Sequence, residues 1–372
     1  MGTPKLDVDA ILADPAIRIV VCCGSGGVGK TTTAAALAVR AAERHGRRTV
    51  VLTIDPARRL AQALGLTELD NTPRLVKGLQ PDSAELQAMM LDMKRTFDEV
   101  VLEHTDPKRA EEIFANPFYQ AMSSTFSGTQ EYMAMEKLGQ LRARDEWDLI
   151  VVDTPPSRSA LDFLDAPARL SRFLDGKMLR LLLAPARAGG RSVFNLVSAS
   201  FGLFSRTVTK ILGAQLLTDL SGFVGALDSM FGGFRERAEQ TYRVLQAPET
   251  AFLVVAAPEP DAVREAMYFA GRLAADRMPL AGLVLNRVVS VPAALSADDA
   301  RAAAGRLDEL GEHPSTAEVL RVHAELADQR DRQAAVSGRF LRAHPGVPVV
   351  KIPAQPADVH DLDGLRAIGY SF

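Results

Sequence analysis

The chain has 372 residues, a mass of 40.1 kDa and 47% hydrophobic residues. This length and apolar content suffice for a large core and predict one large α/β domain with insertions, or two domains. A formal net charge of −3 and a pI near 6.1 exclude the globally basic composition of nucleic-acid-binding proteins, so no nucleic-acid partner is expected.

The cysteines and the apolar stretches indicate where in the cell the protein is expected. The two cysteines, Cys22 and Cys23, are adjacent, and strand neighbours point to opposite faces, so a disulfide framework is excluded. We interpret them as buried thiols rather than a redox or zinc site. Residues 1–15 lack the apolar core of a signal peptide, and 192–205 is shorter than the roughly 20 residues that span a bilayer. We expect a cytoplasmic protein, free or peripheral to the inner face of the membrane.

A glycine-rich loop follows the apolar run 17–23, and an alanine-rich helix is predicted from Gly29 to about Arg44. The glycines let successive backbone N–H groups turn toward phosphate oxygens, and the helix directs its positive dipole end at the same anion. Lys30 can reach the β- and γ-phosphates, and the Thr31 hydroxyl can bind Mg²⁺. The predicted nucleotide-binding residues here are Gly24, Ser25, Gly26, Gly27, Val28, Gly29, Lys30, Thr31 and Thr32.

Further short apolar runs predict a parallel sheet that is buried on both faces, because they are nearly continuous rather than alternating. They lie at 49–54, 149–152, 252–255, 281–285 and 347–352, with a further candidate at 86–91. Helical segments alternate with these runs, notably 261–276, and 297–310 is interpreted as a solvated helix. The predicted fold class is therefore α/β, with a doubly wound, mostly parallel sheet.

Two long segments interrupt this alternation and are predicted to be helical, because they are too long for simple loops. We expect a P-loop NTPase core with an inserted helical subdomain. The predicted bounds are 1–92, 147–166 and 250–372 for the core, and 93–146 and 167–249 for the subdomain.

Two aspartates, Asp55 and Asp153, follow predicted strands. Parallel sheets bind ligands at the carboxyl ends of their strands, so both carboxylates are expected to face the phosphates. Asp153, after four apolar residues, has the position of a Walker-B aspartate that holds Mg²⁺ directly or through water. Asp55 is placed to orient the attacking water. Thr31, Asp55 and Asp153 are the predicted metal residues, and Asp55 and Lys30 the predicted catalytic ones.

The second inserted segment combines basic and apolar residues. Residues 166–218 carry eight Arg or Lys against one acid, a net charge of +7, and apolar side chains recur at helical spacing from Leu220 to Tyr242. This pattern fits a groove for a hydrophobic client, contact with an anionic membrane surface, or the ordinary core of a helical subdomain.

Together these motifs resemble the deviant-Walker-A ATPases of the arsenite-pump and guided-entry-of-tail-anchored-protein group, known in bacteria as anion-transporting ATPases. The resemblance rests on residues 24–32, Asp55-Pro56-Ala57 and Asp153-Thr154-Pro155-Pro156. It extends to 86–92, 127–131, Leu285-Asn286-Arg287 and Ile352-Pro353, and is strongest to actinobacterial members.

The resemblance implies ATP and Mg²⁺ as ligands and a nucleotide-gated dimer whose two ATP sites face each other. Lys30, Thr31 and Thr32 would hold phosphates and Mg²⁺. Asp55 would activate water in switch I, and Asp153 would lie in switch II. By the same resemblance, Asn286 would read the adenine, and the backbone around Pro353 and Ala354 would complete the base pocket.

One departure from that family concerns its signature lysine, which reaches the phosphates of the partner subunit. Ser25 occupies this position here. This departure has three explanations. Hydrolysis is weak, or Arg58 or Arg158 supplies the missing positive charge. In the third, the partner is a paralogous subunit that carries the lysine. We favour the heterodimer, although a homodimer stays open. Switch II also lacks the family's histidine, and two cysteines cannot form the triad of a metalloid pump.

We therefore expect an ATPase whose dimer closure is coupled to a hydrophobic client or a membrane partner. The alternative is a nucleotide-binding regulatory or scaffold subunit with little hydrolysis of its own. A septum- or DNA-positioning ATPase is disfavoured, because 358–372 shows neither a membrane helix nor a basic face.

Overall fold

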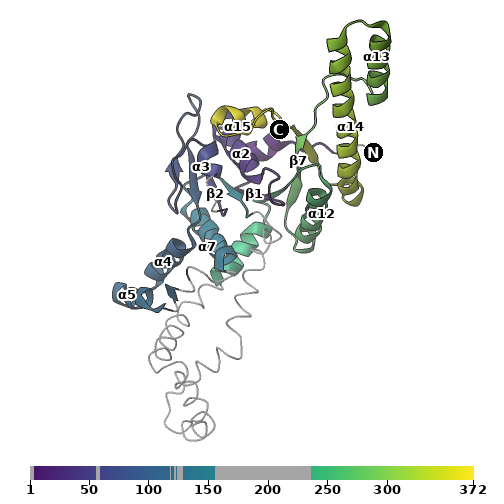
Figure 1. Cartoon of the computed structure of the whole chain (residues 1–372). Helices are drawn as coiled ribbons and strands as arrows, with labels where there is room; N and C mark the ends of the chain where they lie inside the picture. The colour runs from purple at the N-terminus through teal and green to yellow at the C-terminus, as the bar shows by residue number, and fades with distance from the viewer. Residues whose placement is uncertain (1–3, 56–58, 118, 121–122, 124–128, 156–235) are drawn as a thin grey trace, which may run out of the picture. The chain divides into compact units, whose positions relative to one another are not determined.

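A computed structural model of the chain describes residues 4–55, 59–117, 119–120, 123, 129–155 and 236–372 (Figure 1). The chain divides into two compact units. Residues 1–90, 144–161 and 244–372 form the first, which we call the sheet unit. Residues 91–143 and 162–243 form the second, which we call the helical unit.

The sheet unit is built on one eight-stranded sheet in the order β3-β4-β2-β5-β1-β6-β7-β8. All neighbouring strands are parallel except β3, which runs antiparallel to β4 at the edge. This confirms the predicted mostly parallel α/β fold, including the candidate strand at 86–91; the edge strand β3 was not predicted. The strands are β1 Ile19–Cys23, β2 Thr49–Thr53, β3 Arg74–Leu75, β4 Leu86–Met90, β5 Leu149–Asp153, β6 Thr250–Ala256, β7 Leu280–Val288 and β8 Val349–Pro353.

Seven described helices belong to the sheet unit. They are α1 Val8–Ala13, α2 Lys30–His45, α3 Arg59–Ala63, α12 Pro260–Ala275, α13 Ala297–Leu310, α14 Pro314–Ala343 and α15 Leu362–Gly369. The alanine-rich α2 ends at Gly46, whose φ of +61° suits the left-handed C-cap that glycine adopts without strain.

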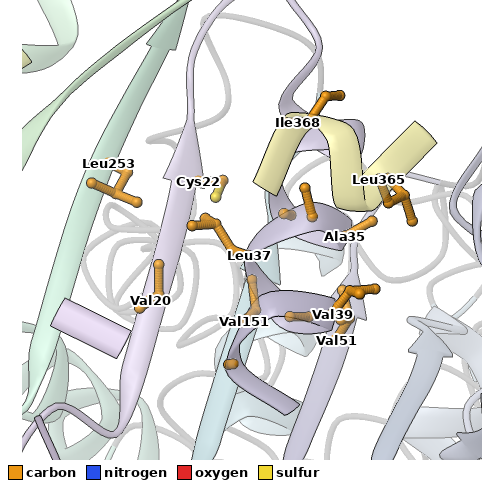
Figure 2. Packing of buried hydrophobic residues seen from close by; sticks show 14 of the residues in the cluster. Val20, Cys22, Ala35, Leu37, Val39, Val51, Val151, Leu253, Leu365 and Ile368 are labelled. Atoms are coloured by element: carbon orange, nitrogen blue, oxygen red, sulfur yellow. The ribbon is translucent and has the colours of Figure 1, made fainter. Parts of the chain in front are cut away.

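The core lies between α2 and the central strands (Figure 2). Val20 and Cys22 of β1 face Leu37 of α2, and Leu365 and Ile368 of α15 pack on the same helix. Alternate strand residues such as Val21 and Phe252 are also fully buried. The strands are therefore covered on both faces, which explains why their sequences are continuously apolar. This core holds the strand ends at which the candidate site is built.

Between β7 and β8 the chain forms a hairpin of α13 and α14, seen as an antiparallel helix pair in Figure 1. The helix predicted at 297–310 is present, but it is not simply solvated as expected. Its alanines pack against α14, because small side chains allow close approach of the two helices. The buried seam comprises Ala297, Ala300, Ala324 and Ala327.

The described part of the helical unit contains α4 Met93–His104, α5 Pro107–Ala115 and α7 Thr129–Arg144, together with the helical residues 236–243. Buried Glu136 pairs with Arg237 at 2.9 Å. Residues 156–235 lie outside the described residues, and with them the basic stretch 166–218 and most of the stripe from Leu220. Within the described ranges, no helix combines the length and apolar character needed to cross a membrane.

The backbone of Gly24, in the loop after β1, lies close to the neighbouring strand β6, and this close approach predicts the effect of a substitution on stability. Its φ is +153°, and a Cβ would lie 2.1 Å from the carbonyl oxygen of Val255 in β6. The change Gly24→Ala is therefore expected to lower the free energy of unfolding by about 2 kcal/mol or more, because backbone must shift.

The matched control is Gly271→Ala in α12, where an added Cβ meets nothing within 4 Å. It should stabilise the fold by up to about 1 kcal/mol through helix propensity. Urea denaturation of both variants measures the effects; equal stabilities for the two variants would contradict this reading of Gly24.

Candidate functional site

The loop between β1 and α2 adopts a backbone that depends on glycine at two further positions. Gly27 and Gly29 have φ of +77° and +91°, and Gly29 is the N-cap of α2. A Cβ on Gly29 would lie 2.3 Å from Nδ2 of Asn286. Because the first N–H groups of a helix have no acceptor within it, those of α2 are available to bind an anion.

Lys30 is folded back onto this loop. Its Nζ donates a 2.8 Å hydrogen bond to the backbone oxygen of Ser25, and its side chain is buried. Burial lowers the pKa of Lys30, while the nearby carboxylates of Asp153 and Asp55 oppose that shift. A phosphate that replaced the Ser25 carbonyl would offer the ammonium a stronger, charged acceptor.

Asp153, the last residue of β5, is fully buried and joins three elements. Its Oδ2 accepts hydrogen bonds from the hydroxyls of Thr31 at 2.8 Å and Thr53 at 2.9 Å. Its Oδ1 is buried without a hydrogen-bond partner among the described residues. Burial raises the pKa of Asp153 to about 6, against the lowering effect of the two hydroxyls.

Asp55 lies just beyond β2 and lines an open cleft, whereas Asp153 does not. Asp153 contacts the hydroxyl of Thr31, which lines the cleft, and the expectation that both carboxylates face the phosphates stays a prediction. Backbone contacts hold the two aspartates in register, because the N–H of Ile54 donates to the backbone oxygen of Asp153 at 3.0 Å.

The cleft has a volume of about 930 Å³, within the upper range of small-molecule sites. It brings together predicted residues from four parts of the chain that are distant in sequence. These are Gly27, Gly29, Lys30, Thr31, Thr32, Asp55, Asn286, Pro353 and Ala354. Gly24, Ser25, Gly26 and Val28 shape the loop but are not among the lining residues.

Asn286, near the end of β7, is bonded to the loop. Its Nδ2 donates to the backbone oxygen of Val28 at 2.9 Å, and its Oδ1 accepts from the N–H of Arg287 at 3.0 Å. One amide hydrogen and one lone pair of Asn286 remain for further contacts. A role in reading adenine is compatible with this arrangement and stays a prediction. The bond to Val28 was missed, since no sequence pattern reports it.

A wall that sequence reasoning also missed closes one side of the cleft. It comprises the segment 355–360 after β8 and Ile368 of α15. An ion pair of 2.7 Å between Arg366 and Glu43 fixes α15 on α2, and Arg366 also donates to the Gly78 oxygen. Asp361, which caps α15 through the Gly364 N–H, was the one local signal for this helix.

Ser25 does not project from the loop. It is buried, and its Oγ has no hydrogen-bond partner among the described residues. Arg58 and Arg158, the candidate substitutes for the missing lysine, lie outside the described residues. The thiols of Cys22 and Cys23 are fully buried, and burial raises the pKa of both, that of Cys23 to about 12. Neither is set up as a reactive thiolate.

The parallel sheet carries this glycine loop, the buried Lys30, and Asp153 hydrogen-bonded to Thr31, the residue after the lysine. This combination defines a P-loop NTPase fold. A model of the anion-transporting ATPase family matches residues 17–300. The chain therefore belongs to the anion-transporting ATPase family, and membership of this family of ATPases implies that it binds ATP.

Individual relatives agree with this assignment. ATPase GET3A of Arabidopsis thaliana is 24% identical over 370 residues, 99% of this chain and 87% of that protein. ATPase GET3 of Malassezia globosa is 29% identical over 164 residues, 44% of this chain and 46% of that protein. An uncharacterised protein of Streptomyces coelicolor is 32% identical over 185 residues, 48% of this chain and 43% of that protein. The last two matches span less than half of each relative.

The burial of Asp153 predicts a pH dependence of stability. Its pKa is about 6 in the fold against an ordinary value of 3.8, so the native state binds the proton more tightly. The contribution of Asp153 to stability is therefore fully present below about pH 4 and is lost as the pH rises through about 6. Asp153→Asn should gain stability relative to wild type as the pH rises from about 4 through about 6, with no further gain at higher pH, as measured by urea denaturation.

Asp148→Asn provides a control of opposite sign. Hydrogen bonds from Arg48 lower the pKa of Asp148, so its contribution is present above its ordinary pKa and is lost in acid. If the stability of Asp153→Asn followed that of the wild type at every pH, the assigned burial of an ionisable carboxyl would be wrong.

Proposed function

We propose that this chain hydrolyses ATP with Mg²⁺ and uses the nucleotide state to open and close its switch loops. The observation that carries the proposal is the continuity of the cleft from Lys30 and Thr31 to Asn286 and Ala354. Such a site can accept a triphosphate at one end and a base at the other. The Streptomyces relative supports a place in the actinobacterial branch.

The residues present fit Mg²⁺. Thr31 and Asp55 line the cleft with oxygen donors, which are the ligands this ion prefers. Asp153 carries one buried oxygen without a described partner, and its other oxygen accepts a hydrogen bond from the Thr31 hydroxyl. Thr31, Asp55 and Asp153 would hold the ion, directly or through water. When bound, it would neutralise charge on the phosphate oxygens.

The chain's own residues would act mainly by position. Lys30 would exchange the Ser25 carbonyl for phosphate oxygens, together with the N–H groups at the start of α2. Asp55 would orient the attacking water toward the terminal phosphate. Asp153 would keep the Thr31 hydroxyl in place by accepting its proton in a hydrogen bond.

The assembly is a further part of the proposal. The burial of Ser25 leaves its hydroxyl unable to reach a facing site, so this chain would not supply the cation in trans. We favour a heterodimer with a paralogous subunit that carries the lysine, over a homodimer with weak turnover. Dimer closure would act on a hydrophobic client or a membrane partner.

Phosphate release measured with and without the paralogous subunit tests the activity. The wild-type chain should hydrolyse ATP in a Mg²⁺-dependent way, faster with the partner, because a cation in trans contributes about 10³–10⁵ in rate. Asp55→Asn should remove turnover, since the water is no longer oriented, while nucleotide affinity is retained.

The same assay distinguishes the alternative. If ATP binds but neither mixture releases phosphate above the Asp55→Asn level, the chain is a nucleotide-binding regulatory or scaffold subunit. The buried Ser25 is the observation that favours this second candidate. Turnover that is undiminished in Asp55→Asn would contradict the assigned role of Asp55.

A further inference from the structure

The cleft contains an arginine that none of the roles above uses. Arg59 begins α3 and lines the cleft together with Gln62. Leu60 and Ala61 are buried, and α3 packs on α2, so the backbone that carries Arg59 is anchored. The side chain itself is exposed. An anchored backbone with a free side chain is suited to reach a ligand in the cleft.

The guanidinium of Arg59 has no hydrogen bond or ion pair with the described residues. Three other arginines of the sheet unit are engaged with carboxylates, Arg40 with Asp9, Arg48 with Asp148 and Arg366 with Glu43, whereas Arg59 and Arg287 line the cleft without an ion pair in the described part of the chain. An unpaired guanidinium at the wall of a polar cleft is a ready partner for an anion, since its planar fork matches phosphate oxygens.

Topology places Arg59 at the phosphate end. In the sheet, β2 and β7 lie on opposite sides of β1, each two positions away. Asp55 and Arg59 follow β2, whereas Asn286 and Arg287 lie at the end of β7. Arg287 therefore belongs to the wall assigned to the base, and Arg59 shares its wall with the residue assigned to the attacking water.

The charge at the loop leaves room for a second cation. Lys30 is the one basic residue among the described residues of the loop 24–32, and Ser25 contributes none. A triphosphate carries more negative charge than a single ammonium balances. We propose, on the basis of the function proposed above, that Arg59 contacts the terminal phosphate of ATP in cis and adds a second positive charge to that of Lys30.

Calorimetry with ADP and with AMP-PNP, a non-hydrolysable ATP analogue, tests this contact without relying on turnover. Arg59→Ala should lose about 10- to 100-fold in affinity for AMP-PNP, as expected for one charge-assisted hydrogen bond, while the affinity for ADP changes less than about threefold. Arg59→Lys should fall in between, because it keeps the charge and loses the fork. Where the chain turns over, kcat of Arg59→Ala should also fall.

Two controls separate local from general effects. Arg287→Ala should weaken ADP and AMP-PNP equally, because it lies at the base wall. Arg306→Ala, an exposed arginine of α13 away from the cleft, should change neither affinity nor thermal stability. If the ratio of the two affinities is the same in Arg59→Ala as in wild type, this inference alone is overturned. Wild-type protein that binds neither nucleotide overturns the proposed function and this inference with it.

Discussion

The structure of the site depends on one buried carboxylate. Oδ2 of Asp153 accepts hydroxyl hydrogen bonds from Thr31 and Thr53, so a single atom joins the first turn of α2 to the carboxyl ends of β5 and β2. Burial makes the charged form of Asp153 unfavourable, and these two hydrogen bonds recover part of that loss. The glycine loop and the segment that carries Asp55 are thereby held by one group, and a ligand that pulls on Thr31 acts on both.

The core beneath the site is buried, whereas Lys30 and Arg59 in the cleft form no ion pair with the described residues. Val20, Cys22 and Leu37 belong to the buried cluster between β1 and α2 (Figure 2). Above it, Lys30 is held by a neutral carbonyl, and Arg59 has no described partner. Groups in this state gain more from a polyanion than they lose on leaving their present contacts. This difference is the physical basis for expecting a conformational response to the nucleotide.

Much of the fold could be predicted from the sequence, because the signals are local. Continuous apolar runs indicated the buried strands, and Gly24 to Thr32 indicated the loop, in which Gly24 and Gly29 adopt positive φ where a side chain would clash. The features that were missed depend on contacts between distant segments. The bond from Asn286 to Val28, the pair Arg366–Glu43 and the alanine seam of α13 and α14 have no pattern within a short window. Arg59 was not singled out from the sequence, because the spacing of residues alone does not show which side chains line a cleft.

The central claim is that a triphosphate with its metal binds in front of Lys30. Titration of ATP into the wild-type chain and into Lys30→Ala, each with and without Mg²⁺ and followed by calorimetry, tests it most directly. The account predicts saturable binding that is stronger with Mg²⁺ and at least about tenfold weaker in Lys30→Ala, because a charged phosphate contact is lost. Absence of heat with the wild type, or undiminished affinity in the variant, would contradict it.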